Sequence, residues 1–180
     1  AVADNSTFNI VGTNGVSVPE PWVVSNVFIY ATTMPPVEEL IVEGPVTFYM
    51  QNDVMLRDML VHSNGNVRLN NSHLTVTSNA TVAVGSALHA DAVGFGTGQG
   101  PGGAESHNRD GGSYGGRGGE RYNPDNNIVG PCYGSILNPL VRGSGGANNV
   151  AGGVVQLTVG GTLTVNGQVY EVPVNPNQTL

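Results

Sequence analysis

Four residues with ionisable side chains that could take part in catalysis lie together in residues 105–110: Glu105, His107, Arg109 and Asp110. A polysaccharide lyase needs a strong base, typically Arg or Lys, and a cation that holds the uronate carboxylate, whereas a glycoside hydrolase needs paired carboxylates. The sequence contains no Lys, only six residues are Lys or Arg, and the strand-like segments carry no Asp pair at alternate positions. We therefore predict that the protein is not an enzyme and that this cluster is a polar patch in a loop.

Metal-binding patterns are weak as well. His62, His73, His89 and His107 lack the short pairwise spacing of a zinc site on one element. Residues 120–127, which include Glu120, Asn123 and Asp125 with its following Asn pair, offer oxygen ligands without the ordered acidic spacing of known calcium loops. We predict no cofactor and keep structural calcium in this segment as an alternative.

The composition predicts an all-β protein. Only 11% of the 180 residues are charged, 27 are Gly, and Val, Ile and Thr together supply 45, which favours strands and excludes a helical bundle. No apolar run reaches the roughly 18 residues needed to cross a bilayer. The net charge of −7 repels phosphate backbones, so nucleic acid is not an expected partner.

A short repeat suggests how these strands are arranged. Residues 60–74 align with residues 75–89 at a shift of 15, and both copies alternate apolar and polar residues before a turn of Asn, Gly or Ser. This alignment places His62 above Thr77 and His73 above Leu88. Short units with one strand pair each are typical of a right-handed parallel β-helix, or β-solenoid, with stacked strands and Asn at the bends. A β-sandwich or jelly roll, with similar strand spacing, stays as the alternative.

The glycine-rich segment is predicted to be an insertion, residues 94–153, because strand-like sequence resumes after it at GGVVQLTVGGTLTVNG. The order ADAVGFGTGQGPGG, GGSYGGRGG, YGS, GSGG and this last motif resembles a recurring module of very large glycine-rich extracellular proteins of plants, protists and some bacteria. The resemblance covers roughly residues 85–170 and implies a pectin-lyase-like β-helix. The sequence departs from the family pattern at residues 169–173, which suggests a coil end or a specialised tail.

The composition and the sequons point to an extracellular or cell-surface protein. The chain begins without Met or a signal core, so we expect a processed chain or a piece of a longer one. Sequons for N-glycosylation occur at Asn5, Asn70, Asn79 and Asn177. The single cysteine, Cys132, is expected to be either a small buried apolar residue or the site of an intermolecular disulfide.

The expected function follows from a clear strand pattern combined with weak catalytic and metal-binding motifs. We expect one β-solenoid domain, residues 1–180, with an extended tail at 170–180 that pairs with a neighbour. An exposed end of a solenoid needs a cap, and no capping helix is present, so we predict a structural module that assembles with copies of itself, or with further modules of a longer chain, into a filament, stalk or surface layer. A glycan- or surface-binding adhesin domain is the alternative, with Tyr114, Tyr122 and Tyr133 as its candidate binding surface.

Overall fold

The computed structural model describes residues 7–10, 22–25, 28–31, 38–104, 110–119 and 129–171. Within these ranges all regular secondary structure is β-strand and no helix is present, as the composition predicted. The chain divides into two compact units, which we call the strand unit (residues 1–68, 72–89 and 157–180) and the glycine-rich unit (residues 69–71 and 90–156). The predicted insertion, residues 94–153, lies within the second of them.

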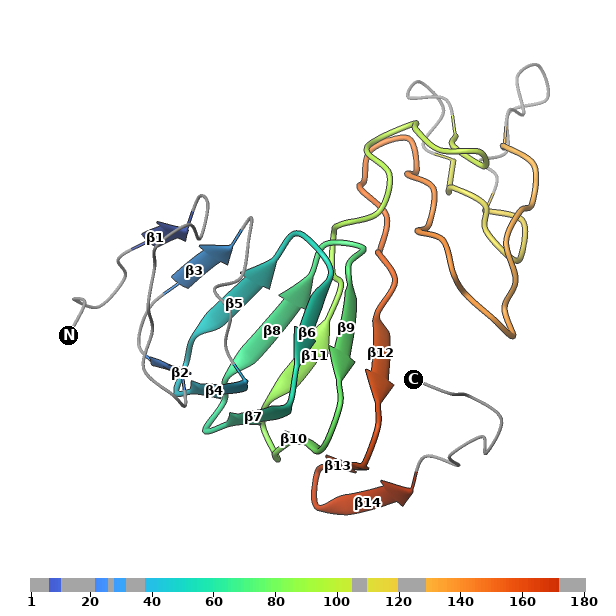
Figure 1. Ribbon diagram of the computed structural model, residues 1–180. Helices are drawn as coiled ribbons and strands as arrows, with labels where there is room; N and C mark the ends of the chain where they lie inside the picture. Colours follow the sequence, from blue (N-terminus) through green and yellow to red (C-terminus); the bar gives the residue numbers. More distant parts are fainter. Residues whose placement is uncertain are drawn as a thin grey trace. The chain divides into compact units, whose positions relative to one another are not determined.

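The strands of the described residues belong to three sheets (Figure 1). The first sheet has the order β1 (Thr7–Ile10), β3 (Phe28–Ala31), β5 (Thr47–Met50), β8 (Asn66–Leu69) and β11 (Ala87–His89). The second has the order β14 (Gln168–Glu171), β13 (Thr162–Val165), β10 (Ala80–Val82), β7 (Asp58–His62), β4 (Glu39–Glu43) and β2 (Trp22–Ser25). The third has the order β12 (Gln156–Val159), β9 (His73–Val76) and β6 (Val54–Leu56).

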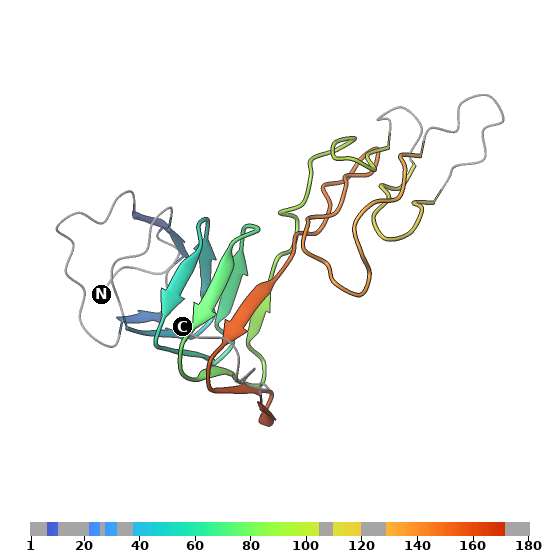
Figure 2. The same cartoon turned by 45° about the vertical axis from the view of Figure 1, so that its right-hand side comes forward.

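From β5 onward, successive strands lie in the first, third and second sheets in turn and then return to the first, whereas β1 to β4 alternate between the first and second sheets. Strands β5, β6 and β7 form one such triplet, β8, β9 and β10 form the next, and β11, β12 and β13 form the terminal triplet. Pairing is parallel in β1–β3–β5, β2–β4–β7–β10–β13, β6–β9 and β8–β11, and Figure 2 shows the arrows of the third sheet pointing the same way. An antiparallel sandwich would require the opposite pairing.

The structure corrects the predicted repeat length. Met59 pairs with Ala80 and Val54 pairs with Leu74, which are offsets of 21 and 20 residues, so the shift of 15 and the single strand pair per unit are wrong. A shift of 15 lays β7 onto β9, and these strands belong to different sheets. Because β7, in the second sheet, and β9, in the third, have the same alternation of buried and half-buried residues, sequence similarity did not distinguish their sheets.

The core of the strand unit follows directly from this alternation. In β4, β7, β8 and β9 every second residue is buried, as expected for strands with one face toward a shared interior. Phe48 in β5 and Leu40 in β4 have no exposed surface and are among the largest fully buried side chains. Burial of such side chains is worth roughly 1.5–3 kcal/mol each relative to exposure. The interior of the triplets is therefore the main source of stability in this unit.

The glycine-rich unit is held together by its backbone. Residues 70–72 join β8 to β9, whereas residues 90–155 join β11 to β12. Hydrogen bonds cross between distant segments of this connection, from Phe95 N to Gly143 O (2.9 Å) and from Gly98 N to Gly146 O (2.9 Å). A Cβ atom at Gly145 would overlap the carbonyl oxygen of Gly96. Glycine is therefore required here by close backbone approach rather than by chain flexibility.

Candidate assembly surface at the terminal triplet

The interior of the terminal triplet is incompletely covered. The inward-facing residues of the two preceding triplets are at most 8% exposed. In the terminal triplet, Val159 is buried, but four other apolar residues are only half-buried: Leu88, Leu157, Leu163 and Val165. The apolar column that runs through the strand unit therefore ends at a surface with partly exposed leucine and valine side chains.

Register places Leu88 and Leu163 in line with buried residues of the preceding triplet. Leu88 pairs with Val67, which has no exposed surface. Leu163 pairs with Ala80 in the second sheet, and Ala80 is also fully buried. Because a parallel register keeps inward positions aligned from strand to strand, the difference in burial arises from the position at the end of the stack. The residue types themselves are ordinary core residues.

One of the three sheets continues beyond the terminal triplet. Strand β14 pairs antiparallel with β13 after a two-residue turn, Asn166 (φ 50°) and Gly167 (φ 78°). Two positive φ values in a two-residue hairpin are typical of a type I′ turn, for which Asn-Gly is the preferred sequence. Part of the predicted tail, residues 170–171, thus pairs within the chain, and residues 172–180 lie outside the described residues. The predicted pairing of the tail with a neighbour stays a prediction.

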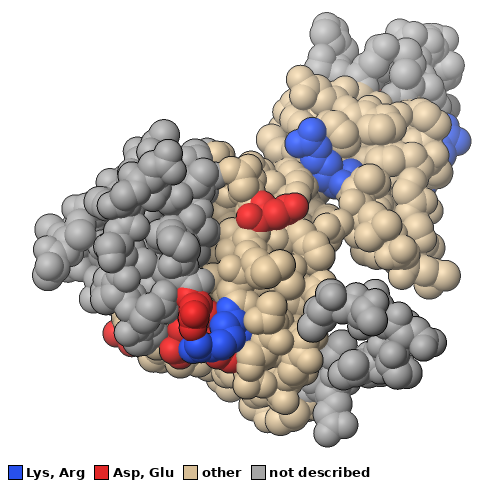
Figure 3. All heavy atoms as spheres, viewed as in Figure 1, with Lys and Arg blue, Asp and Glu red and all other residues tan. Residues whose placement is uncertain are grey.

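A row of polar groups links the starts of three neighbouring strands of the second sheet, β7, β10 and β13. Asn79 N donates to Asp58 Oδ1 (3.1 Å), and Thr162 N donates to Asn79 Oδ1 (3.1 Å). Arg57 Nε donates to Asp58 Oδ2 (2.8 Å), and Arg57 also forms an ion pair with Glu38. Figure 3 shows the red and blue atoms side by side on this unit. The row joins the terminal triplet to the two turns before it through the side chains of Asp58 and Asn79, and Asn is not stacked on Asn at these positions.

The electrostatics of this row predict a small pH effect. The hydrogen bond from Arg57, followed by that from the Asn79 backbone, lowers the pKa of Asp58. A lowered folded-state pKa contributes stability that is present above the unfolded value of about 3.9 and is lost as pH falls through the folded value. We expect Asp58→Asn to be less stable than wild type at pH 7 in urea unfolding, by a margin that narrows at acid pH. A margin that widens on acidification would contradict this assignment.

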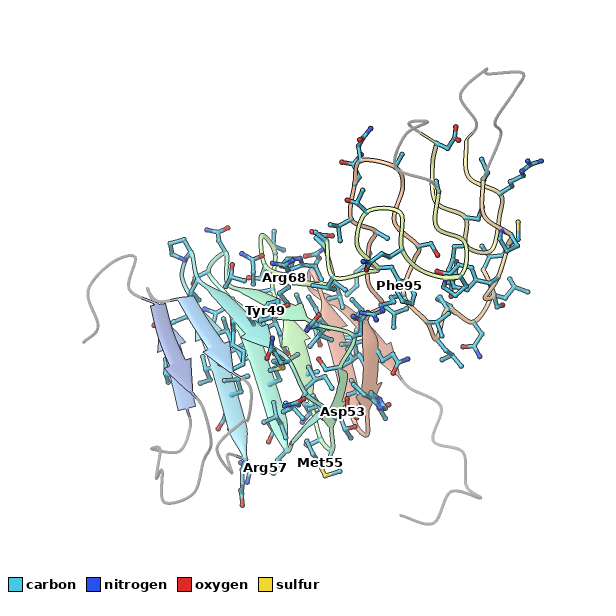
Figure 4. The ribbon with its side chains drawn as sticks, turned by 90° about the horizontal axis from the view of Figure 1, so that it is seen from above. Tyr49, Asp53, Met55, Arg57, Arg68 and Phe95 are labelled. Carbon is cyan, nitrogen blue, oxygen red and sulfur yellow. The ribbon has the colours of Figure 1, made fainter. Side chains whose placement is uncertain are left out.

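The outward faces carry isolated polar and aromatic contacts. In the first sheet the Arg68 guanidinium lies over the Tyr49 ring, 5.1 Å from its centroid, and Figure 4 shows the two side chains together. On the third sheet His73 N donates to Asp53 Oδ1 (2.7 Å), and His73 Nε2 lies 2.8 Å from Thr158 Oγ1. These contacts join neighbouring strands. They do not form a convergent catalytic group.

The structure also corrects the predicted positions of two histidines. His62 pairs with Glu43 instead of stacking on Thr77, and its Nε2 lies 3.2 Å from a Glu43 carboxylate oxygen. His73 lies beside Asp53 and Thr158 instead of Leu88. Both errors follow from the wrong repeat length.

Among the described residues no group of three or more His, Cys, Asp or Glu is placed to hold a metal ion.

The predicted tyrosine surface is used within the chain. The rings of Tyr114 and Tyr133 meet edge to face, with centroids 5.1 Å apart and an interplanar angle of 79°. The Tyr133 hydroxyl donates to Arg142 O (2.7 Å) and accepts from Ser144 Oγ (2.8 Å). The Tyr114 hydroxyl is buried and has no hydrogen-bond partner among the described residues. Both rings are half-buried and pack against each other, and the binding surface stays a prediction.

The loop that follows this pair exposes apolar side chains. Ile136 is 78% exposed and Leu137 is 95% exposed. The loop shape is fixed locally, because Ser135 Oγ accepts hydrogen bonds from Leu137 N (3.2 Å) and Asn138 N (3.1 Å). Cys132 at the start of the loop is exposed and free, so the expectation of a buried cysteine is wrong. Its intermolecular disulfide stays a prediction.

The remaining predicted residues are distributed over the chain. Asn70 is half-buried at the end of β8 and Asn79 is exposed, with its Nδ2 3.1 Å from Ser78 Oγ; glycosylation at both stays a prediction. Asp110 is only 3% exposed. The other predicted residues lie outside the described ranges: Asn5, Glu105, His107, Arg109, residues 120–127 with Tyr122, and Asn177.

Sequence reasoning did not single out the residues of the terminal surface. Leu157 and Leu163 appear in an ordinary alternating strand pattern, and nothing in that pattern distinguishes the last layer of a stack from an inner one. The antiparallel strand β14 had a usable signal, because Asn166-Gly167 between two apolar segments is a strong hairpin motif.

Comparisons with protein-family models, curated proteins and solved structures gave no match. Among the described residues no helix has the length and apolar character for crossing a membrane.

Proposed function

We propose that this protein is an extracellular structural module in which the strand triplets are coils of a right-handed parallel β-solenoid. Copies of the chain, or further modules of a longer chain, assemble end to end at the terminal triplet. The observation that carries this proposal is the half-buried state of Leu88, Leu157 and Leu163, next to two triplets whose inward-facing residues are buried. Covering each of these side chains completely would contribute about 1 kcal/mol.

The arrangement of strands supports the same proposal. β11 and β12 are the last strands of their sheets in the order of the described residues. A terminal parallel strand offers backbone groups that a further strand can pair with. The polar contacts of Asp58, Asn79 and His73 join neighbouring turns and strands. The glycan-binding alternative receives less support, since Tyr114 and Tyr133 contact each other.

The proposal is tested by the size of the protein as a function of concentration. We expect sedimentation velocity and negative-stain microscopy to show concentration-dependent end-to-end particles. Leu88→Asp places a charge on the terminal surface, where a lone molecule can hydrate it but an interface cannot. We expect this variant to remain monomeric and folded by circular dichroism.

The matched control is Val84→Asp, because Val84 is 74% exposed in the turn before β11 of the same unit. This variant should assemble like wild type. A wild-type protein that stays a monodisperse monomer at high concentration would overturn the proposal. Equal assembly of the Leu88→Asp and Val84→Asp variants would show that the contact does not lie at the terminal triplet.

A further inference from the structure

Strand β14 occupies an edge that end-to-end assembly would need. A further parallel strand in the second sheet would pair with the outer edge of β13. In the structure this edge is paired with β14, which runs antiparallel, with Thr164 opposite Val169. The same chain therefore covers the growing edge of one sheet, whereas the first and third sheets end on β11 and β12.

The opposite end of the same sheet has the strand that fits this edge. β2 is the other terminal strand of the second sheet, and its register places Trp22 at the position of Leu40. The row continues through Met59 and Ala80 to Leu163. If β2 of a second copy paired with β13 in this register, the row would continue without interruption from one copy to the next. The half-buried Leu163 would then be covered like the preceding residues of its row.

The hairpin is weakly held for a strand of this sheet. Among the described strands, β14 pairs with β13 alone. Val169 at its centre is 63% exposed, so it contributes little apolar burial. β14 can leave the sheet without loss of the β10–β13 pairing, and hairpins form on the microsecond timescale. Exchange of β14 for an incoming strand is therefore accessible without unfolding of the triplets.

From these observations we infer that β14 is a displaceable cap, and that β2 of a second copy replaces it on β13 during assembly. This inference rests on the proposed function and adds its regulation. While β14 is paired, the edge of β13 is closed and single molecules persist. When β14 is released, the parallel sheet continues into the next molecule.

A reversible covalent lock tests the cap. Thr164 and Val169 are directly opposite across the hairpin, a position at which a cross-strand disulfide can form. The variant Thr164→Cys/Val169→Cys is made in a Cys132→Ser background, so that the two new thiols pair with each other when glutathione disulfide is added as the oxidant. We expect light scattering to show no assembly of the oxidised protein and full assembly of the same sample after reduction. Cys132→Ser alone is the control and should be insensitive to redox state.

A second variant opens the cap. Gly167→Val places a β-branched residue at φ 78°, where such residues are strongly disfavoured, so β14 should detach and assembly should become severalfold faster. Equal assembly of the locked and reduced proteins, or loss of assembly in Gly167→Val with native circular dichroism, would overturn the inference. If wild type and Gly167→Val assemble at the same rate, the cap is rejected and the proposed function stands. If neither assembles, both are rejected.

Discussion

Replacing Gly145 by alanine is expected to destabilise the glycine-rich unit by about 2–3 kcal/mol, a cost typical of an atom forced into a packed interior. A Cβ at this position would overlap the carbonyl oxygen of Gly96, and Gly145 N also donates to Gln99 O (3.0 Å). Backbone on both sides cannot move aside as a flexible side chain can. Hydrogen exchange of peptides from residues 94–104 and 143–153 would measure the loss of protection.

Gly152→Ala is the matched control in the same unit. No atom lies within 4 Å of a Cβ built at Gly152, and its φ is not positive. This substitution should be neutral or stabilising by up to about 1 kcal/mol, because alanine restricts the unfolded chain more than glycine does. Equal effects of the two substitutions would show that close backbone approach does not hold the unit together.

Replacing Phe48 by alanine is expected to cost the strand unit about 3–5 kcal/mol. Phe48 lies in β5, has no exposed surface, and is the largest fully buried side chain among the described residues. Its removal leaves a cavity in the interior of the first complete triplet, where the paired strands β3 and β8 on either side limit collapse. Urea unfolding followed by circular dichroism at 218 nm, the region of the β-sheet signal, would report the change.

Met55→Ala is the control for the Phe48 substitution. Met55 lies in the neighbouring strand β6 with 71% of its surface exposed, and Figure 4 shows it on the outside of the unit. An exposed apolar residue of this kind should change stability by no more than about 0.5 kcal/mol. A comparable loss in both variants would mean that the alternation of β5 and β6 has been assigned to the wrong faces.

Local strand preference was readable along most of the strand unit. The alternation over residues 58–62 and 73–76 matches two strands with every second residue buried, and the turn residues Asn64 and Asn71 adopt positive φ as expected for Asn at bends. The repeat length was not readable in this way. Three sheets with the same alternation produce several alignments of similar quality, and only the pairing partners distinguish them.

At the candidate site, too, residue types were readable from the sequence but positions in the sheets were not. Tyr114, Tyr133 and Cys132 stood out because of their residue types, yet the two tyrosines pack against each other and the cysteine is exposed. Leu88 and Leu163 had no distinguishing type. Leu88 and Leu163 are candidate contact residues because they lie in the terminal triplet. That position depends on which strands are neighbours and not on the residue types.

The sequence by itself determined that this chain is built of strands, since residue preference and alternation act over a few neighbouring positions. It also determined that the glycine-rich segment interrupts the strands, because a change in composition is visible without any contact. Only the tertiary structure decided the offsets of about 20 residues between paired strands, the end of the apolar column and the antiparallel direction of β14. Each of these is a relation between segments far apart in the chain, set by the packing that buries them together.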